Sequence, residues 1–405
     1  MAKSRMVSLW GAIVIGASAL ALAVPASAED VIKIGDINSY TNFPEHCTPY
    51  KNGMDLAVDE INAAGGINGK RLVVITRDDK ATAGDAIRAA EGLISREHVQ
   101  AISGSMLSSV ALALNEFARQ NKVLFLATLS LSDRQIYQEG HRYGFRLRAG
   151  TYTQSAILAE KAATLGKKRW ALVYPNYEFG QASVTNFKQM LQKAQPDVTF
   201  VAEQAVPLGK IDASAVVQSL LDAKPDGIFS VLFATDLLKF VRAGGTEGLF
   251  EGRAVLGELA GEPENLEPLK DDAPAGWWVT GYPWNDVKTP EHDAFRKAYE
   301  KRFGVHPAIS SIMGYTTIKT LAEAFKKAGS PDTEKVVDAM SGLEVDMPWG
   351  KLKYRPQDNL STMGSFIGQI SKGAPVPIMI NSEYKQGGQY LPSDAMVKEW
   401  RKPAN

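Results

Sequence analysis

The stretch INAAGGINGK, from Ile61 to Lys70, decides how the first part of the chain folds. It follows a strand-like VIKIGD and a helix-like NGMDLAVDE, and it precedes a second strand-like run, RLVVITRDD. Gly65 and Gly66 are placed where a helix ends, because glycine adopts the left-handed backbone that caps exposed carbonyls. Asn68-Gly69 then predicts a tight turn into the next strand. We assign these glycines a structural role and no ligand.

The same alternation of strand and helix continues outward from this stretch. Short β-branched runs such as VQAISG and VLFLA alternate with helical patterns up to GFRLRAG at 144–150. The alternation restarts with RWALVYP at 169–175 and continues to AVLG at 254–257. A mainly helical section follows at 283–350, and WGKLKYRP and GSFIGQIS resemble strands. The pattern predicts an α/β protein with two doubly wound, parallel-sheet lobes.

The first residues are typical of an export signal. Lys3 and Arg5 precede an apolar run at about 7–24, and Ala26-Ser27-Ala28 forms a small-x-small cleavage site. A membrane anchor is the alternative, but glycine and serine interrupt the run and a cleavage signal ends it. We therefore predict cleavage after Ala28 and a periplasmic mature protein.

Composition excludes several classes of function. The chain has 45 Lys and Arg and 45 Asp and Glu, and loss of Lys3 and Arg5 takes the net charge to −2. There is no basic surplus for nucleic acid. The single cysteine, Cys47, is interpreted as a small, partly buried apolar residue. The five histidines show no metal-ligand spacing, so we expect no metal and no cofactor.

The order of motifs resembles one known family. IKIG, NGMDLAVDEINAAGGINGKRL, RDD, GSMLSS and FRLRAG resemble, in that order, the leucine/isoleucine/valine-type (type I) periplasmic solute-binding proteins of ABC importers. The resemblance covers essentially the whole mature chain and is strongest over 31–150. It implies two lobes joined by a hinge of three crossovers, with the ligand in the cleft. The implied lobes are residues 29–150 with 283–355, and residues 151–282 with 356–405, after the signal peptide at 1–28. The implied partners are a small ligand and the permease subunits of the inner membrane, and a monomer is expected.

The carboxylate end of the ligand is predicted in the first lobe. Ser108 and Ser109 open a predicted helix, whose free N–H groups suit an anion. The resemblance assigns the carboxylate-binding serine to Ser108, although either serine can be a simple helix cap. Thr128, Leu129 and Ser130 match a second family loop that contacts the carboxylate, and an ordinary polar loop is the alternative.

The apolar part of the ligand is expected against aromatic side chains. The resemblance places Phe179, just before Gly180, and Phe233 against it, whereas packing within the lobe is an equal interpretation for Tyr177. The loop at 36–50 contributes further candidates, namely Tyr40, Phe43 and Tyr50. Ser310 completes the set of candidate contacts.

Departures from the family concern the ligand's ammonium group. One acidic family position corresponds to Thr151 here, and the other falls near Glu258, although Leu259 can occupy that register. A buried ammonium without an acidic partner is costly. The ligand class is therefore open between a hydrophobic amino acid and an aromatic or aliphatic acid. Arg146 is interpreted as structural, and Arg148 as structural or as a further anion contact.

Two other classes of function are weighed. A sensory binding protein that signals to a membrane receptor would share the fold, so the sequence barely separates it from a transport protein. A secreted hydrolase is disfavoured, because the chain lacks a G-x-S-x-G elbow and an H-E-x-x-H motif. We expect binding without catalysis.

Overall fold

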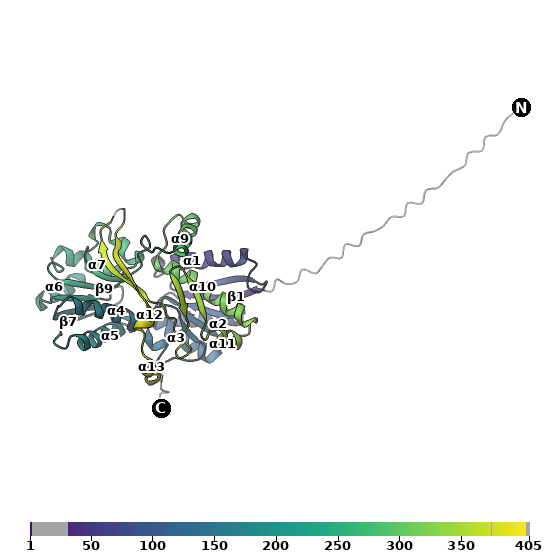
Figure 1. Cartoon of the computed structure of the whole chain (residues 1–405), viewed down its shortest axis with the longest axis horizontal. Helices are drawn as coiled ribbons and strands as arrows, with labels where there is room; N and C mark the ends of the chain where they lie inside the picture. Colours follow the sequence, from purple (N-terminus) through teal and green to yellow (C-terminus); the bar gives the residue numbers. More distant parts are fainter. Residues whose placement is uncertain (2–30, 374, 402–405) are drawn as a thin grey trace. The chain divides into compact units, whose positions relative to one another are not determined.

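The computed structural model describes Met1, residues 31–373 and residues 375–401. The predicted signal peptide beyond Met1 lies outside the described residues, and so does its cleavage site. The described chain forms a five-stranded sheet, a seven-stranded sheet and a two-stranded sheet. Figure 1 shows the two large sheets with helices packed around each of them.

The five-stranded sheet is built entirely from parallel neighbours, in the order β2-β1-β3-β4-β5. Its strands are β1 (Val31–Asn38), β2 (Arg71–Asp78), β3 (Ala101–Gly104), β4 (Leu124–Ala127) and β5 (Gly144–Arg146). One face packs on α2 (Ala83–Ser95) and α3 (Ser108–Asn121), and the other on α1 (Pro44–Ala63), α9 (Pro290–Phe303), α10 (Ile309–Ala328) and α11 (Thr333–Met340). We call this group, with the hairpin of β11 (Glu344–Met347) and β12 (Gly350–Lys353), the first lobe.

The seven-stranded sheet has the order β14-β13-β10-β9-β8-β6-β7. Its strands are β6 (Arg169–Pro175), β7 (Thr199–Val206), β8 (Gly227–Ser230), β9 (Ala254–Gly261), β10 (Trp278–Gly281), β13 (Ser365–Ser371) and β14 (Ile378–Lys385). β13 and β14 are antiparallel to their neighbours, and the other pairs are parallel. The helices around it are α4 (Thr151–Thr164), α5 (Glu178–Ala194), α6 (Ala213–Ala223), α7 (Ala234–Thr246), α8 (Pro263–Leu266) and the 3₁₀ helix η2 (Glu267–Asp272). We call this group the second lobe.

The chain passes between the two lobes three times, at 147–150, 282–289 and 354–364. This confirms the predicted fold class, an α/β protein with two doubly wound lobes and three crossovers. The exact lobe boundaries stay a prediction. The C-terminal helix α13 (Asp394–Trp400), which follows α12 (Gly387–Tyr390), packs near the 3₁₀ helix η1 (Asp133–Gln135), because Val397 joins the apolar cluster of Ile136 and Tyr137.

The turn after α1 has the predicted geometry. Gly65 and Gly66 have φ of 96° and 75°, in the left-handed region. A Cβ on Gly66 would lie 2.1 Å from the carbonyl oxygen of Lys70, so glycine is required there for space as well as for conformation. The side chain of Asn62 then bonds to both the N–H and the carbonyl of Leu72, which ties the helix end to β2.

The first helix differs from the prediction at its start. We expected a loop over 36–50, but α1 begins at Pro44, so Tyr50 is a buried helical residue. The proline explains the start, because its fixed φ suits the first helical position and it has no N–H to lose there. Pro49 lies inside the same helix, which hid the helical pattern in the sequence.

Two glycines let α1 and α10 approach each other within backbone contact. A Cβ on Gly53 of α1 would lie 1.9 Å from the carbonyl oxygen of Ser311, and a Cβ on Gly314 of α10 would lie 2.0 Å from that of Tyr50. These two glycines therefore allow α1 to pack against α10, which lies more than 250 residues later in the sequence. This contact closes one face of the first lobe's core.

We predict that Gly314→Ala lowers the free energy of unfolding by about 1–3 kcal/mol, because the added methyl group forces the two helices apart. The matched control is Gly245→Ala in α7, where a Cβ meets nothing within 4 Å. That control is expected to change stability by less than about 1 kcal/mol, in the stabilising direction. Urea denaturation measures both variants, and an equal loss in the two would contradict the close contact.

A buried carboxyl group lies at the centre of the first sheet. Asp36 of β1 is completely buried and accepts hydrogen bonds from the Tyr40 hydroxyl at 2.7 Å and from Asn38 and Ser103 at 3.3 Å. Burial raises the pKa of Asp36 to about 7, although these hydrogen bonds partly oppose the shift.

This raised pKa predicts how stability depends on pH. The unfolded carboxyl has a pKa near 3.8, so between that pH and about pH 7 the folded protein holds a proton that the unfolded chain has released. Stability from this group is therefore lost as the pH rises through that window. Relative to Asp36→Asn, whose amide does not ionise, the wild-type free energy of unfolding should fall between about pH 4 and about pH 7. Parallel pH profiles of the two proteins in urea denaturation would rule this out.

Candidate functional site

A cavity with an empty volume of about 330 Å³ lies between the two lobes. First-lobe segments line it after β3 and β4, and second-lobe segments line it after β6, β8 and β9. These are carboxyl ends of parallel strands, where open α/β sheets place their ligands. The lining residues are His46, Met106, Ser108, Leu129, Leu131, Arg148, Tyr177, Phe179, Phe233, Leu259, Glu262 and Asn265.

Ser108 is the first residue of α3, and it lines the cavity on the side of the first lobe. The residue before it, Leu107, is the N-cap and offers no side-chain acceptor, and no side chain of the described residues bonds to the first-turn N–H groups of α3. Ser108 is buried, and its Oγ accepts only a long bond of 3.4 Å from the N–H of Leu131. A hydroxyl beside uncapped N–H groups at a helix start suits a carboxylate.

The other candidates for the carboxylate contacts lie at different places. Leu129 lines the cavity, but Ser109 is exposed on the outer face of α3. Thr128 is buried and donates from its Oγ1 to the Tyr50 hydroxyl at 3.2 Å, away from the cavity. Ser130 does not line the cavity either, and its Oγ is buried with no hydrogen-bond partner among the described residues.

The second-lobe wall is aromatic. The ring of Phe233 lies 6.0 Å from that of Phe179, at 75°, and 6.1 Å from that of Phe43. Tyr177 extends the wall, with its ring 6.1 Å from Phe179. Both Phe179 and Phe233 therefore face the cavity, and Phe43 supports the wall from the first lobe without lining it. Burial raises the pKa of Tyr177 well above its ordinary value, so its hydroxyl stays protonated.

A buried ion pair completes the wall. Arg148, from the first crossing segment, pairs with Glu262 at the start of α8, and both side chains are almost fully buried. Burial lowers the pKa of Arg148 to about 10, which still leaves it charged at neutral pH. Asn265 orders this corner, because it donates to Glu262 at 3.3 Å and to the carbonyl of Leu259 at 3.1 Å. Arg146, by contrast, does not line the cavity; it bonds to Asp133 at 2.6 Å and to the carbonyl of Leu131 at 3.3 Å, which agrees with a structural role.

Glu258 does not reach the cavity, whereas its neighbour Leu259 does. The register of β9 with β10 shifts between Gly257 and Gly261, and Leu259 has a left-handed φ of 63°, so regular strand alternation is interrupted here. The Oε1 of Glu258 accepts from the Ser183 hydroxyl at 3.0 Å, behind the wall. Burial raises the pKa of Glu258 to about 8, so it is largely neutral at pH 7. It cannot serve as a ready partner for an ammonium group in the cavity.

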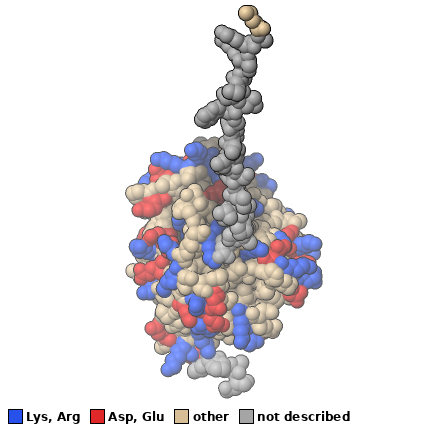
Figure 2. All heavy atoms as spheres, turned by 90° about the vertical axis from the view of Figure 1, so that its right-hand side faces the viewer, with Lys and Arg blue, Asp and Glu red and all other residues tan. Residues whose placement is uncertain are grey.

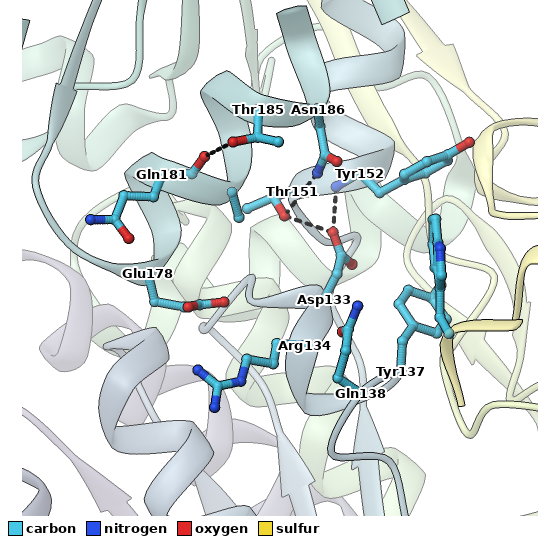
Figure 3. A pocket seen from close by; sticks show the side chains of 12 residues that line it. Asp133, Arg134, Tyr137, Gln138, Thr151, Tyr152, Glu178, Gln181, Thr185 and Asn186 are labelled. Carbon is cyan, nitrogen blue, oxygen red and sulfur yellow. Dashed lines mark hydrogen bonds between the residues drawn. The ribbon is translucent and has the colours of Figure 1, made fainter. Parts of the chain in front are cut away.

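Thr151 lies in a different hollow. Its Oγ1 donates to Asp133 at 2.6 Å inside an open groove with an empty volume of about 900 Å³, which Figure 3 shows. Tyr137, Tyr152 and Trp400 form the aromatic side of this groove, while Glu178 accepts from Ser132 at 2.8 Å across the two lobes. The family resemblance made Thr151 a candidate contact for the ligand's ammonium group, but its hydroxyl is bonded to Asp133 and it does not line the cavity.

Tyr40 and Ser310 also lie outside the cavity. The Tyr40 hydroxyl donates to the buried Asp36 of β1 at 2.7 Å. Ser310, at the start of α10, donates its N–H to Glu264 at 2.8 Å, and its Oγ is buried without a partner among the described residues. Neither residue lines the cavity.

Tyr177, for which the sequence left packing and contact open, lines the cavity, and several further lining residues were not considered, namely His46, Met106, Leu131, Glu262 and Asn265. Glu262 carried a usable signal, because it follows the strand AVLGELAG as the other cavity residues follow their strands. His46 carried none, since its position depends on α1 beginning at Pro44. Met106 and Leu131 lie within two positions of the predicted Ser108 and Ser130, and the local sequence does not show which side chains of these loops line the cavity.

The electrostatic character of the cavity follows from these contacts. Arg148 and Glu262 neutralise each other, and no second carboxylate lines the wall among the described residues. The N-terminal end of α3, with its free N–H groups, is therefore the part of the cavity wall that attracts negative charge. No cluster of three metal-ligating side chains occurs in the described part of the chain. On the face drawn in Figure 2, acidic and basic side chains are interspersed rather than gathered by sign.

The comparisons with known proteins agree with this arrangement. Residues 32–375 match the family model described as periplasmic binding protein. A relative from Brucella suis, "Leu/Ile/Val-binding protein homolog 7", is 27% identical over 373 residues, which cover 87% of this chain and 91% of that one.

Solved structures extend the comparison. A solute-binding protein of an ABC transporter from Rhodopseudomonas palustris, in complex with 3,4-dihydroxybenzoic acid, is 26% identical with a TM-score of 0.80, covering 89% of this chain and 100% of that one. A branched-chain amino acid transporter substrate-binding protein from Streptococcus pneumoniae, in complex with isoleucine, is 20% identical with a TM-score of 0.76, covering 88% and 99%. The second likeness concerns the fold alone.

No helix in the described residues has the length and apolar character needed to cross a membrane. The family match spans both lobes and the cavity between them, and its relatives are solute-binding proteins. This chain therefore belongs to the periplasmic binding protein family, as a substrate-binding protein of the ABC-transporter type.

Proposed function

We propose that this protein captures a small carboxylate with an aromatic or otherwise hydrophobic body, and that it delivers this ligand to the permease of an ABC importer. The observation that carries the proposal is the pairing of Ser108, at the uncapped start of α3, with the Phe179–Phe233 wall across one interlobe cavity. The helix start attracts the carboxylate, and the aromatic wall buries the apolar body.

Within this class we propose an acid that lacks an α-ammonium group. The cavity wall offers a single carboxylate, Glu262, and Arg148 already occupies it. Glu258 lies behind the wall with a raised pKa. An ammonium group would therefore enter without a free partner, at a cost of several kcal/mol. The 3,4-dihydroxybenzoic acid bound by the Rhodopseudomonas relative is such an acid.

A hydrophobic amino acid is the second candidate. It would require Glu262 to exchange the guanidinium of Arg148 for the ligand's ammonium, which leaves Arg148 buried and without its partner. The name of the Brucella relatives favours this candidate, and the charge distribution of the cavity favours the acid.

The rest of the proposal concerns cellular context. We propose export through a signal peptide cleaved after Ala28, a periplasmic monomer, and permease subunits of the inner membrane as partners. Ser108 and His46 both line the cavity, but the Oγ of Ser108 is bonded to the N–H of Leu131, and no hydrogen bond joins it to His46 among the described residues. This supports binding without catalysis. The relatives named above are transport proteins, so a sensory role has less support.

A matched pair of ligands tests the ligand class. 3-Phenylpropanoate and phenylalanine differ only in the amine, as do 4-methylpentanoate and leucine. We expect the amine-free member of at least one pair, or a hydroxybenzoate, to raise the melting temperature of the mature protein by mass action. Stabilisation by the amino acids alone would reject the amine-free class and support exchange at Glu262.

Ser108 can be tested beside its own neighbour. Ser108→Ala removes one hydrogen bond to the carboxylate, so titration calorimetry should show affinity weakened by about 1–3 kcal/mol, which is roughly 5- to 150-fold. Ser109→Ala, one residue further along the same helix but exposed, is expected to bind like the wild type. Equal affinity in the two variants would remove Ser108 from the site.

A further inference from the structure

Acidic residues of the second lobe hold the start of a first-lobe helix at a place outside the ligand cavity. We infer that Glu264 and Glu267 form a latch that stabilises the closed cleft by binding the N-terminal end of α10. Glu264 belongs to α8 and Glu267 begins η2, which pack with the second sheet, whereas α10 packs on the first sheet. The inference rests on the proposed binding function.

The first contact caps α10 from the opposite lobe. The Oε1 of Glu264 accepts a hydrogen bond from the N–H of Ser310 at 2.8 Å, and both residues are buried. The N-cap of α10 is Ala308, which has no side-chain acceptor of its own. A carboxylate at an uncapped helix start gains a charge-assisted hydrogen bond and a favourable interaction with the helix dipole.

This is the one side-chain hydrogen bond of Glu264 among the described residues, although its charge also acts on the buried Arg148. Its Oε2 has no partner among the described residues, and neither has the Oγ of Ser310 beside it. The carboxylate therefore gains its protein hydrogen bond only when the lobes are together. In an open form, water must replace that bond.

The second contact is an ion pair one turn further along. The Nε2 of His306 lies 2.9 Å from the Oε1 of Glu267. The indole of Trp284, from the second crossing segment, stacks on the His306 ring at 4.0 Å and 1°. Three segments thus meet at this point: the second-lobe η2, the crossing chain and the residues before α10.

Protonation of His306 controls the second contact. Burial alone would lower the pKa of His306, but the carboxylates of Glu267 and, more weakly, Glu300 of α9 outweigh it and raise the pKa above its ordinary value. The charge on His306 is therefore present at lower pH and lost as the pH rises through this raised pKa. The latch should weaken in the same direction.

The same short segment also contacts the ligand cavity. Glu262 and Asn265 line the cavity, whereas Glu264, Glu267 and His306 do not. One rigid turn thus presents one set of side chains to the ligand and another to α10. Because apparent affinity scales with the fraction of protein in the binding-competent state, a latch outside the site changes affinity without touching the ligand.

The decisive variant is Glu264→Ala, with Asp271→Ala as its control. Asp271 is an exposed acid of the same segment, so its removal changes the charge equally without touching α10. We expect Glu264→Ala to weaken binding of an acid from the panel roughly tenfold through faster dissociation. Asp271→Ala should bind like the wild type. Unchanged affinity and dissociation rate in Glu264→Ala would overturn the latch.

A fluorescence-transfer measurement separates closure from ligand contact. Dyes on Ser95→Cys in α2 and Gln218→Cys in α6 label exposed positions of the two lobes, while the native Cys47 is buried. Without ligand, Glu264→Ala should show lower transfer efficiency than Asp271→Ala, and at saturating ligand the two should agree. Equal efficiency without ligand would overturn the latch. If no acid in the ligand panel binds, the proposed ligand class is rejected. The comparison of transfer efficiencies without ligand still tests the latch in that case.

Two further variants complete the test. If Glu264→Ala does not fold by circular dichroism, Glu264→Gln replaces it, because the amide keeps an acceptor but loses the charge. Its affinity should still fall, and wild-type affinity would overturn the role of the charge. For His306, wild-type affinity should weaken as the pH rises from about 5.5 to about 8, and His306→Gln should lose this dependence. Identical pH profiles would remove His306 from the latch.

Discussion

The constraint that organises this protein is the parallel connection of its strands. A parallel pair needs a crossover, so every strand ends at the same edge of its sheet and the connecting loops gather there. Two such edges face each other here, and the cavity is made from the segments after β3, β4, β6, β8 and β9. The site therefore takes its residues from distant parts of the sequence. Each lobe alone supplies half of it.

The chemistry of the cavity depends on how its charges are paired. Arg148 and Glu262 are both buried, and each needs the other. Their pairing removes the carboxylate that an ammonium group would use and leaves the start of α3 as the dominant feature. The selectivity proposed for amine-free acids thus comes from the mutually neutralising Arg148–Glu262 pair beside the uncapped start of α3. The aromatic wall around Phe233 would add affinity for apolar groups of more than one shape.

Closure and recognition meet in one short segment. Glu262 and Asn265 face the cavity. Glu264, which lies between them in the sequence, faces α10 instead. In the proposed latch, a movement that orders this turn for the ligand would also order it for the opposite lobe. The close approach of α1 and α10 at Gly53 and Gly314 makes the receiving helix a firm part of the first lobe. The proposed latch would then act between the packed helices of two lobes rather than between loops.

The sequence by itself determined the α/β class, the two lobes and the glycine turn after α1, because these follow from local periodicity and from residues with few backbone options. It also placed Ser108, Leu129, Phe179 and Phe233 at strand ends that converge on the cavity. Only the tertiary structure decided which side chain of each neighbouring pair lines the cavity. Leu259 lines the wall while Glu258 turns behind it, and Thr151 is drawn away by Asp133. Those outcomes depend on the backbone irregularity at Leu259 and on partners distant in sequence, which local patterns do not encode.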